Sequence, residues 1–223
     1  MTVAILRFPG TNCEFDTQYA FEKIGHTTQL IWHEDELLPE GIDLVVVPGG
    51  FSYGDYLRSG SIARFAPIMK AVTTYANNGG KVLGICNGFQ ILTEAGLLPG
   101  ALKRNNNLHF ISKHQNLCVI NNDNAFLNLC ENGEVLNIPI AHADGNYYID
   151  AEGFKEIEAN GQILLRYSDE NGSPVVVNGS VTSIAGVCNK TKNVFGLMPH
   201  PERALEAILG SEDGIRMLKG FDA

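Results

Sequence analysis

Short apolar runs alternate with amphipathic stretches along the first hundred residues. The runs read as β-strands, and they lie at 3–6, 27–32, 44–47 and 81–85. Residues 14–24 and 62–76 carry apolar positions at helical spacing, and a third helix is expected over 87–96. The run 44–47 ends abruptly at Pro48-Gly49-Gly50, as a strand buried on both faces does. This alternation predicts an α/β fold with a doubly wound, mostly parallel, flavodoxin-like sheet.

The second half of the chain has a less regular pattern. Its strand candidates are separated by turns rich in Asn and Gly, and lie at 110–122, 135–140, 146–149, 163–167, 175–177, 184–188 and 194–198. We expect some of these strands to pair antiparallel, and we expect a last helix over 204–209. No repeat or linker interrupts the chain, so a single domain over residues 1–223 is predicted.

Composition narrows the possible functions. The chain has 223 residues, of which 44% are hydrophobic and 18% charged, which is typical of a soluble globular protein. Lys and Arg number 16 against 25 Asp and Glu, and a formal net charge of −9 makes nucleic acid an unfavourable partner. No segment is apolar over the thickness of a membrane, and no basic stretch precedes a long apolar run at the start, so we expect a cytoplasmic location. The 5 cysteines show no C-x-x-C spacing, so neither a disulfide framework nor a metal site is expected.

The strongest chemical motif is Gly84-Ile85-Cys86-Asn87-Gly88, between a predicted strand and a predicted helix. A glycine on each side of a nucleophile at such a junction is the pattern of a nucleophile elbow, here with cysteine. The helix N-terminus favours a thiolate at Cys86, and the Asn87 N–H can face a developing oxyanion. The competing interpretation is a buried core cysteine in a glycine-rich turn.

A general base for this thiol is expected at the end of another strand. The run 194–198 is followed by Pro199-His200-Pro201-Glu202. In this segment Glu202 can accept a hydrogen bond from the second N–H of the His200 imidazole. The competing interpretation is the ordinary start of a helix, which explains Pro199 and Pro201 and gives His200 no catalytic role. Gly50, after another strand, can supply the second N–H of an oxyanion hole.

These motifs, in this order and spacing, resemble the class I, or triad, glutamine amidotransferases over nearly the whole chain. The resemblance implies that Cys86 is the nucleophile, His200 the base and Glu202 the group that orients it. It also implies an oxyanion hole at Gly50 and Asn87. Glutamine would contact Gly49, Phe51, Gln90 and Phe110. The last belongs to the segment 105–110, in which Asn107 and His109 stand where the family usually has serine and a basic residue.

Further stretches, at 9–14, 50–60, 139–147 and 198–203, resemble the branch of this family that serves purine biosynthesis. That branch implies a glutaminase subunit that hydrolyses glutamine and delivers ammonia to a large synthetase subunit, which makes formylglycinamidine ribonucleotide. A small accessory subunit is also implied. The chain has no Walker motif, so ATP and Mg²⁺ are expected on the partner. Tyr53, Asp55 and Arg58 are candidates for the partner interface, and His142 is either functional or structural.

Two other functions stay open at this point. A self-sufficient cysteine hydrolase of the same fold, similar to a γ-glutamyl peptidase, would carry the same elbow and triad, although the segment 51–60 argues against it. A non-catalytic flavodoxin-like binding module would share the fold, and it would leave Cys86, His200 and Glu202 far apart.

Overall fold

A nine-stranded sheet organises the computed structural model, which describes residues 1–222. The strand order is β2-β1-β3-β4-β11-β10-β9-β6-β7. The strands are β1 (Thr2–Arg7), β2 (Thr27–Trp32), β3 (Leu44–Val47), β4 (Lys81–Ile85), β6 (Ile111–Val119), β7 (Val135–His142), β9 (Ile163–Ser168), β10 (Ile184–Cys188) and β11 (Val194–Leu197). A separate pair consists of β5 (Ala101–Lys103) and β8 (Asn146–Tyr148).

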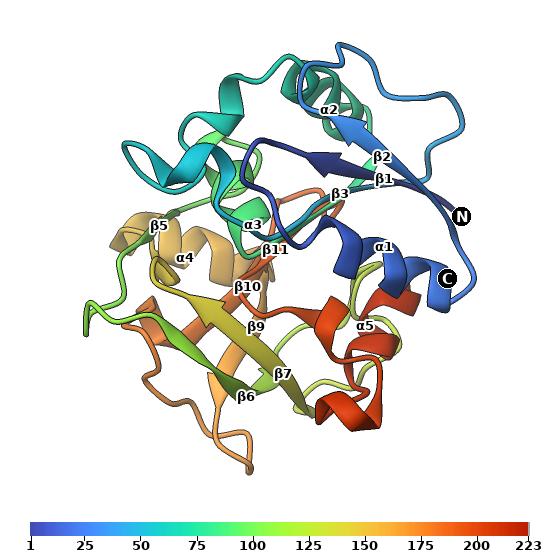
Figure 1. The fold of residues 1–223 in the computed structure, drawn as a ribbon. Coiled ribbons are helices and arrows are strands. Elements are labelled where there is room, and N and C mark those ends of the chain that lie inside the picture. The colour runs from blue at the N-terminus through green and yellow to red at the C-terminus, as the bar shows by residue number, and fades with distance from the viewer. Residues whose placement is uncertain (223) are drawn as a thin grey trace.

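The first part of the sheet is parallel and covered on both faces. Parallel pairs join β2 to β1, β1 to β3, β3 to β4 and β4 to β11. Every residue of β3 and β11 is buried, which requires helices on both sides of the sheet. One side carries α1 (Glu14–Lys23) and α5 (Gly214–Lys219), and the other carries α2 (Ile68–Asn77), α3 (Asn87–Glu94) and α4 (Ala151–Ala159) (Figure 1). The predicted doubly wound α/β class is confirmed.

The rest of the sheet is antiparallel. The strands β11, β10, β9, β6 and β7 pair in this order, each antiparallel to the next. The expected antiparallel additions are therefore confirmed, and they extend the sheet from the edge of β11.

Three strand ends determine where the site lies. In the parallel registers, Val47 of β3 is opposite Gly84 of β4, and Ile85 of β4 is opposite Leu197 of β11. The carboxyl ends of these three strands are neighbours, so the loops that follow them meet at one edge of the sheet. Ligands of open α/β sheets bind at such an edge.

Some predicted elements were wrong. The helix expected over 62–76 begins only after Pro67, and a short 3-10 turn at Ala63–Phe65 precedes it. The helix expected over 204–209 is a 3-10 turn at Ala207–Leu209, and the true last helix is α5. Residues 175–177 form no strand.

One helix was missed. The N-cap of α4 is Asp150, whose carboxylate accepts a hydrogen bond of 2.7 Å from the Gly153 N–H. The sequence pattern alone did not reveal this N-cap.

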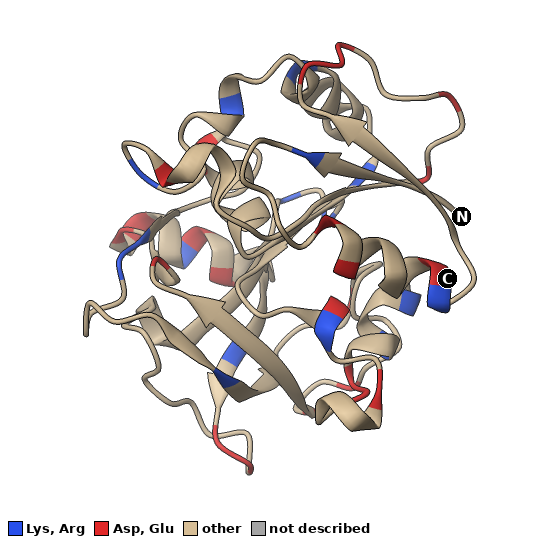
Figure 2. Cartoon of the chain, in the orientation of Figure 1, with Lys and Arg blue, Asp and Glu red and all other residues tan. Residues whose placement is uncertain are grey.

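Charged side chains are spread over the described residues (Figure 2), and none of the helices there is long and apolar. Within 1–222, no helix combines the length and the apolar character that crossing a membrane requires. Lys and Arg are dispersed among the elements, and acidic residues likewise occur in both helices and loops (Figure 2).

Candidate active site

Cys86 occupies a strained turn between β4 and α3. Its backbone has φ 51° and ψ −105°, a conformation that residues with a Cβ rarely adopt. The turn is tight enough that a Cβ on Gly88 would lie 1.8 Å from the Val47 carbonyl oxygen. A Cβ on Gly84 would lie 2.6 Å from Leu92 Cδ1. Both glycines are thus required by close approach, and the predicted elbow geometry is confirmed.

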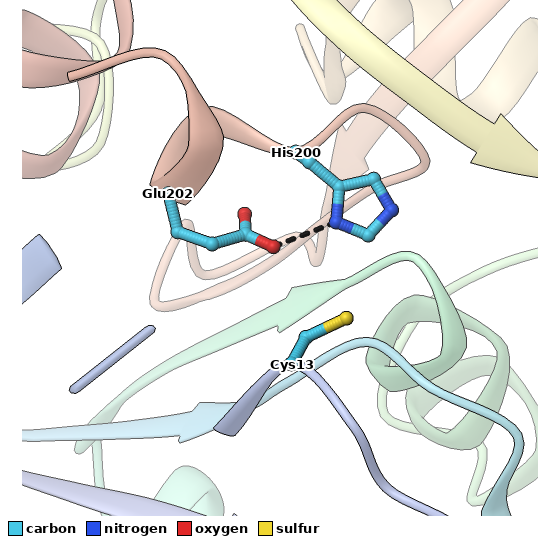
Figure 3. Close-up of side chains that lie close together, drawn as sticks. All are labelled: Cys13, His200 and Glu202. Carbon is cyan, nitrogen blue, oxygen red and sulfur yellow. Dashed lines mark hydrogen bonds and ion pairs between the residues drawn. The ribbon is translucent and has the colours of Figure 1, made fainter. Parts of the chain in front are cut away.

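His200 follows β11 and is held from two directions. Its Nδ1 lies 2.6 Å from Glu202 Oε1, and both side chains are buried (Figure 3). The His200 backbone N–H donates to the Pro139 carbonyl at 2.8 Å. His200 Nε2 has no hydrogen-bond partner among residues 1–222. The free nitrogen is the one that a general base presents to its nucleophile.

The electrostatics of this pair favour a protonated imidazole. Burial alone would lower the pKa of His200, but the charges of Glu202 and Cys86 raise it well above the usual imidazole value. A charged imidazole beside a sulfur stabilises a thiolate. Burial raises the pKa of the thiols of Cys13, Cys118, Cys130 and Cys188, to about 11 in the last two.

A cavity of about 170 Å³ brings many of the predicted residues together. Cys86, His200, Gly50, Phe51, Gln90 and Phe110 all line it. Three predicted residues stand just behind the lining. Glu202 supports His200, Asn87 begins α3, and Gly49 packs so closely that an added Cβ would lie 2.9 Å from His200 Cε1. The sequence motifs therefore converge on one cavity.

The oxyanion candidates come from two neighbouring strand ends. Asn87 is the first residue of α3, where backbone N–H groups have no partner inside the helix. Gly50 has φ 146°, and a Cβ there would lie 2.8 Å from the Asn12 nitrogen. The Asn87 side chain accepts from the Ser52 N–H at 3.0 Å, which ties the loop after Gly50 to the elbow.

Gln90 is already engaged inside the protein. Its Oε1 accepts from Asn87 Nδ2 at 2.9 Å, and its Nε2 donates to the Asp144 carbonyl at 2.8 Å. Gln90 therefore also fixes the loop that follows β7.

Asn105 holds the segment that carries Phe110. Its side chain donates to the carbonyls of His109 and His142, each at 2.9 Å, and accepts from the Gly145 N–H at 3.0 Å. Asn107 and His109 are exposed, and Asn107 accepts only from the His109 N–H. The two departures from the family pattern thus lie outside the cavity.

The candidates for the partner interface separate into different environments. The Tyr53 hydroxyl lies 2.8 Å from His33 Nδ1, and its ring packs against Phe8 and His33. Asp55 lines the cavity rather than the outer surface. Arg58 is exposed and contacts Glu94 at 2.6 Å. Among these three, Arg58 is the side chain that projects outward.

Sequence reasoning gave no role to Cys13 and Asp144, and it left that of His142 open, although all three line the cavity. Cys13 Sγ accepts a hydrogen bond of 3.2 Å from Arg203 Nη2. His142 is 2% exposed, its Nε2 lies 3.5 Å from the Tyr167 hydroxyl, and burial lowers its pKa to about 4. Only the similarity of the stretches 9–14 and 139–147 to the family pointed to these residues, because no motif spacing places them in the cavity.

Cys13 also completes a cluster with the catalytic pair. Cys13, His200 and Glu202 each offer a ligand atom, and these atoms lie within 4.8 Å of one another (Figure 3). Thiolate, imidazole and carboxylate are zinc ligands. However, Glu202 Oε1 already bonds His200, so metal binding here would compete with the orientation of the base.

Comparison with known proteins agrees with this geometry. Residues 1–213 match the family model of the CobB/CobQ-like glutamine amidotransferase domain. The chain is 66% identical to phosphoribosylformylglycinamidine synthase subunit PurQ of Sulfurimonas denitrificans, over 99% of each sequence. It is 66% identical to the subunit PurQ of Wolinella succinogenes, again over 99% of each. A chain in the structure of PurLQS from Thermotoga maritima superposes with a TM-score of 0.88 at 42% identity, covering 99% of this chain and 96% of that one.

The chain therefore belongs to the glutamine amidotransferases. Within them it belongs to the family of phosphoribosylformylglycinamidine synthase subunit PurQ. The resemblance drawn from the motifs is confirmed.

Proposed function

We propose that this chain, acting as one domain, is the glutaminase subunit of a phosphoribosylformylglycinamidine synthase in purine biosynthesis, with Cys86, His200 and Glu202 as its triad. The observation that carries the proposal is the convergence of a strained cysteine elbow and a buried His200–Glu202 pair on one cavity. Full-length identity to PurQ subunits supports the same function.

The first half-reaction releases ammonia. His200 holds the proton given up by Cys86, and the Cys86 thiolate attacks the side-chain amide carbon of glutamine. The negative charge that develops on the amide oxygen is stabilised by the N–H groups of Gly50 and Asn87. His200 then gives its proton to the amide nitrogen, the C–N bond breaks, and ammonia leaves behind a glutamyl thioester on Cys86.

The second half-reaction regenerates the enzyme. His200 takes a proton from water, and the resulting hydroxide attacks the thioester carbon at the same oxyanion site. The C–S bond breaks, the sulfur recovers its proton from His200, and glutamate leaves. Gly49, Phe51, Gln90 and Phe110 border the glutamine during both steps.

The ammonia is consumed outside this chain. We place ATP and Mg²⁺ on a large synthetase subunit, since the sequence has no Walker motif, and a small accessory subunit completes the assembly in the cytoplasm. The segment containing Tyr53, Asp55 and Arg58 is the docking surface for the synthetase. Its exposed apolar side chains support this assignment, because Tyr56 is 74% and Leu57 91% exposed.

Docking has a direct route to the site. Tyr53 anchors the segment through His33, and the Ser52 N–H bonds the side chain of the oxyanion residue Asn87. Several residues of the segment have left-handed backbone conformations, including Tyr53, Asp55 and Leu57. Partner contact can therefore shift the Gly49–Gly50 peptide into its productive orientation.

The decisive experiment separates the ammonia source from its use. Cys86→Ala in the assembled complex should abolish synthesis driven by glutamine and preserve synthesis driven by added ammonium salt. Loss of both activities in a complex of normal composition would refute this division of labour.

A further inference from the structure

The cavity lining also contains acidic residues outside the triad. Asp55 and Asp144, from loops far apart in the sequence, both line the cavity. Ser59 Oγ donates to Asp144 Oδ2 at 2.7 Å, across a separation of 85 residues. We call Asp55, Ser59 and Asp144 the acidic wall.

The carboxylates of the acidic wall have few hydrogen-bond partners within the protein. Asp55 Oδ1 and Asp144 Oδ1 are buried atoms without a hydrogen bond from any residue in 1–222. Asp144 Oδ1 lies 3.5 Å from Arg104 Nε, but the Arg104 side chain is 74% exposed, so water screens this pair. Burial and the charge of Asp144 raise the pKa of Asp55. A buried carboxylate oxygen without a donor is costly, and a cation in the cavity relieves that cost.

Two buried imidazoles, His142 and His200, also line the cavity. His142 Nδ1 and His200 Nε2 both lack a hydrogen-bond partner among the described residues, and both side chains are 2% exposed. His142 is neutral at physiological pH because burial lowers its pKa to about 4. The His200 nitrogen faces the nucleophile in the proposed mechanism, whereas the buried polar atoms of Asp55, Asp144 and His142 are free to meet a polar group of the substrate.

The acidic wall is also rigid. Gly60, directly after Ser59, packs so tightly that a Cβ would lie 2.7 Å from the Ile91 nitrogen of α3. Gln90 of the same helix holds the Asp144 carbonyl at 2.8 Å. Both loops of the acidic wall therefore rest on α3, whose N-cap is Cys86. This contact fixes their position relative to the nucleophile.

We propose that Asp55 and Asp144 bind the α-ammonium group of the amino-acid substrate and thereby select a free amino acid over other carboxamides. This assignment rests on the proposed glutaminase function. The α-ammonium is a compact cation with three N–H donors, which suits two carboxylates that converge on one cavity. The amide at the far end of the same molecule then lies beside Cys86.

The test compares two substrates in the assembled complex. One is L-glutamine, and the other is its analogue without the α-amino group, 5-amino-5-oxopentanoate. Asp55→Asn keeps the side-chain shape, and asparagine tolerates the left-handed conformation of this residue, whose φ is 55°. We expect kcat/KM for glutamine to fall about 10- to 100-fold, the range for a lost hydrogen bond to a charged group, while kcat/KM for the analogue stays unchanged.

Asp144→Asn provides a second variant with the same expected pattern. Asp123→Asn, at an exposed carboxylate paired with Lys192, is the matched control and should change neither value. An equal loss for both substrates, or an unchanged preference for glutamine, would overturn the inference. If the proposed function itself fails, the wild-type complex releases no glutamate from glutamine, which is a different result.

Discussion

The two ends of the cavity are built in different ways. The nucleophilic end combines Cys86, His200 and the oxyanion glycine, each placed directly after a neighbouring strand of the parallel sheet. The acidic wall combines residues further along the loop after β3 with Asp144 of the loop after β7, and both loops are held against α3. Bond-breaking chemistry is thus fixed by the rigid core, and substrate recognition is assigned to loops that the core only supports.

Removing the base from the nucleophilic end should have the largest effect of the tests that follow. His200→Ala should lower glutaminase kcat by about 10²- to 10⁴-fold, the usual contribution of general acid–base catalysis. Steady-state release of glutamate by the complex measures it. Ammonia-dependent synthesis is the control, and a fall in that activity would point to misassembly instead of lost catalysis.

Displacing the base without removing it should cost less. In Gly49→Ala the new methyl group would lie 2.9 Å from His200 Cε1 and 3.0 Å from Cys13 Sγ, so the ring must move. We expect kcat to fall about 10²-fold, as for a shift of about 1 Å in a reacting group. Ammonia-dependent synthesis by the complex is again the control for correct assembly. Wild-type kcat in Gly49→Ala would argue against this packing.

Neutralising the orienting carboxylate should have a smaller effect. In Glu202→Gln, kcat/KM should fall about tenfold, at the lower end of what a lost hydrogen bond to a charged group costs. Because Glu202 raises the pKa of His200, its loss lowers that pKa and the imidazole loses its proton at lower pH. The alkaline limb of the pH profile should therefore move to lower pH. A limb that stays in place, or a loss as large as that of His200→Ala, would contradict the role of Glu202.

The smallest effect is expected outside the cavity. Arg58→Glu reverses an exposed charge on the proposed docking segment and should weaken binding of the synthetase about fivefold, which corresponds to ~1 kcal/mol. Titration calorimetry measures this change, and Lys155→Glu on α4 is the matched control. Unchanged affinity together with unchanged activation of the glutaminase would remove Arg58 from the interface.

The contrast between the two ends also explains what the sequence could predict. Strands buried on both faces, such as 44–47 and 81–85, give unbroken apolar runs, and the residues that end them carry compact motifs. Cys86 and His200 were therefore found from local patterns. Pairing between remote loops has no local pattern, so sequence reasoning assigned no role to Asp144 and did not reveal that Asp55 lines the cavity.

The errors in secondary structure have local causes. At 204–209, Glu206 adopts an extended backbone, and its carboxylate pairs with Lys23 at 2.7 Å, so tertiary contact overrides helix propensity. The missed α4 has only one fully buried position, Ile157, which leaves little apolar periodicity to detect.

The identity of the nucleophile is the central claim, and covalent labelling tests it most directly. The assembled complex would be treated with a glutamine analogue that carries an electrophilic side chain, digested, and mapped by mass spectrometry. We predict one adduct, on Cys86, and strongly slowed labelling in His200→Ala. Cys13 lies in the same cavity but remains a protonated thiol, because burial raises its pKa. An adduct found mainly on Cys13, Cys118, Cys130 or Cys188 would contradict the account.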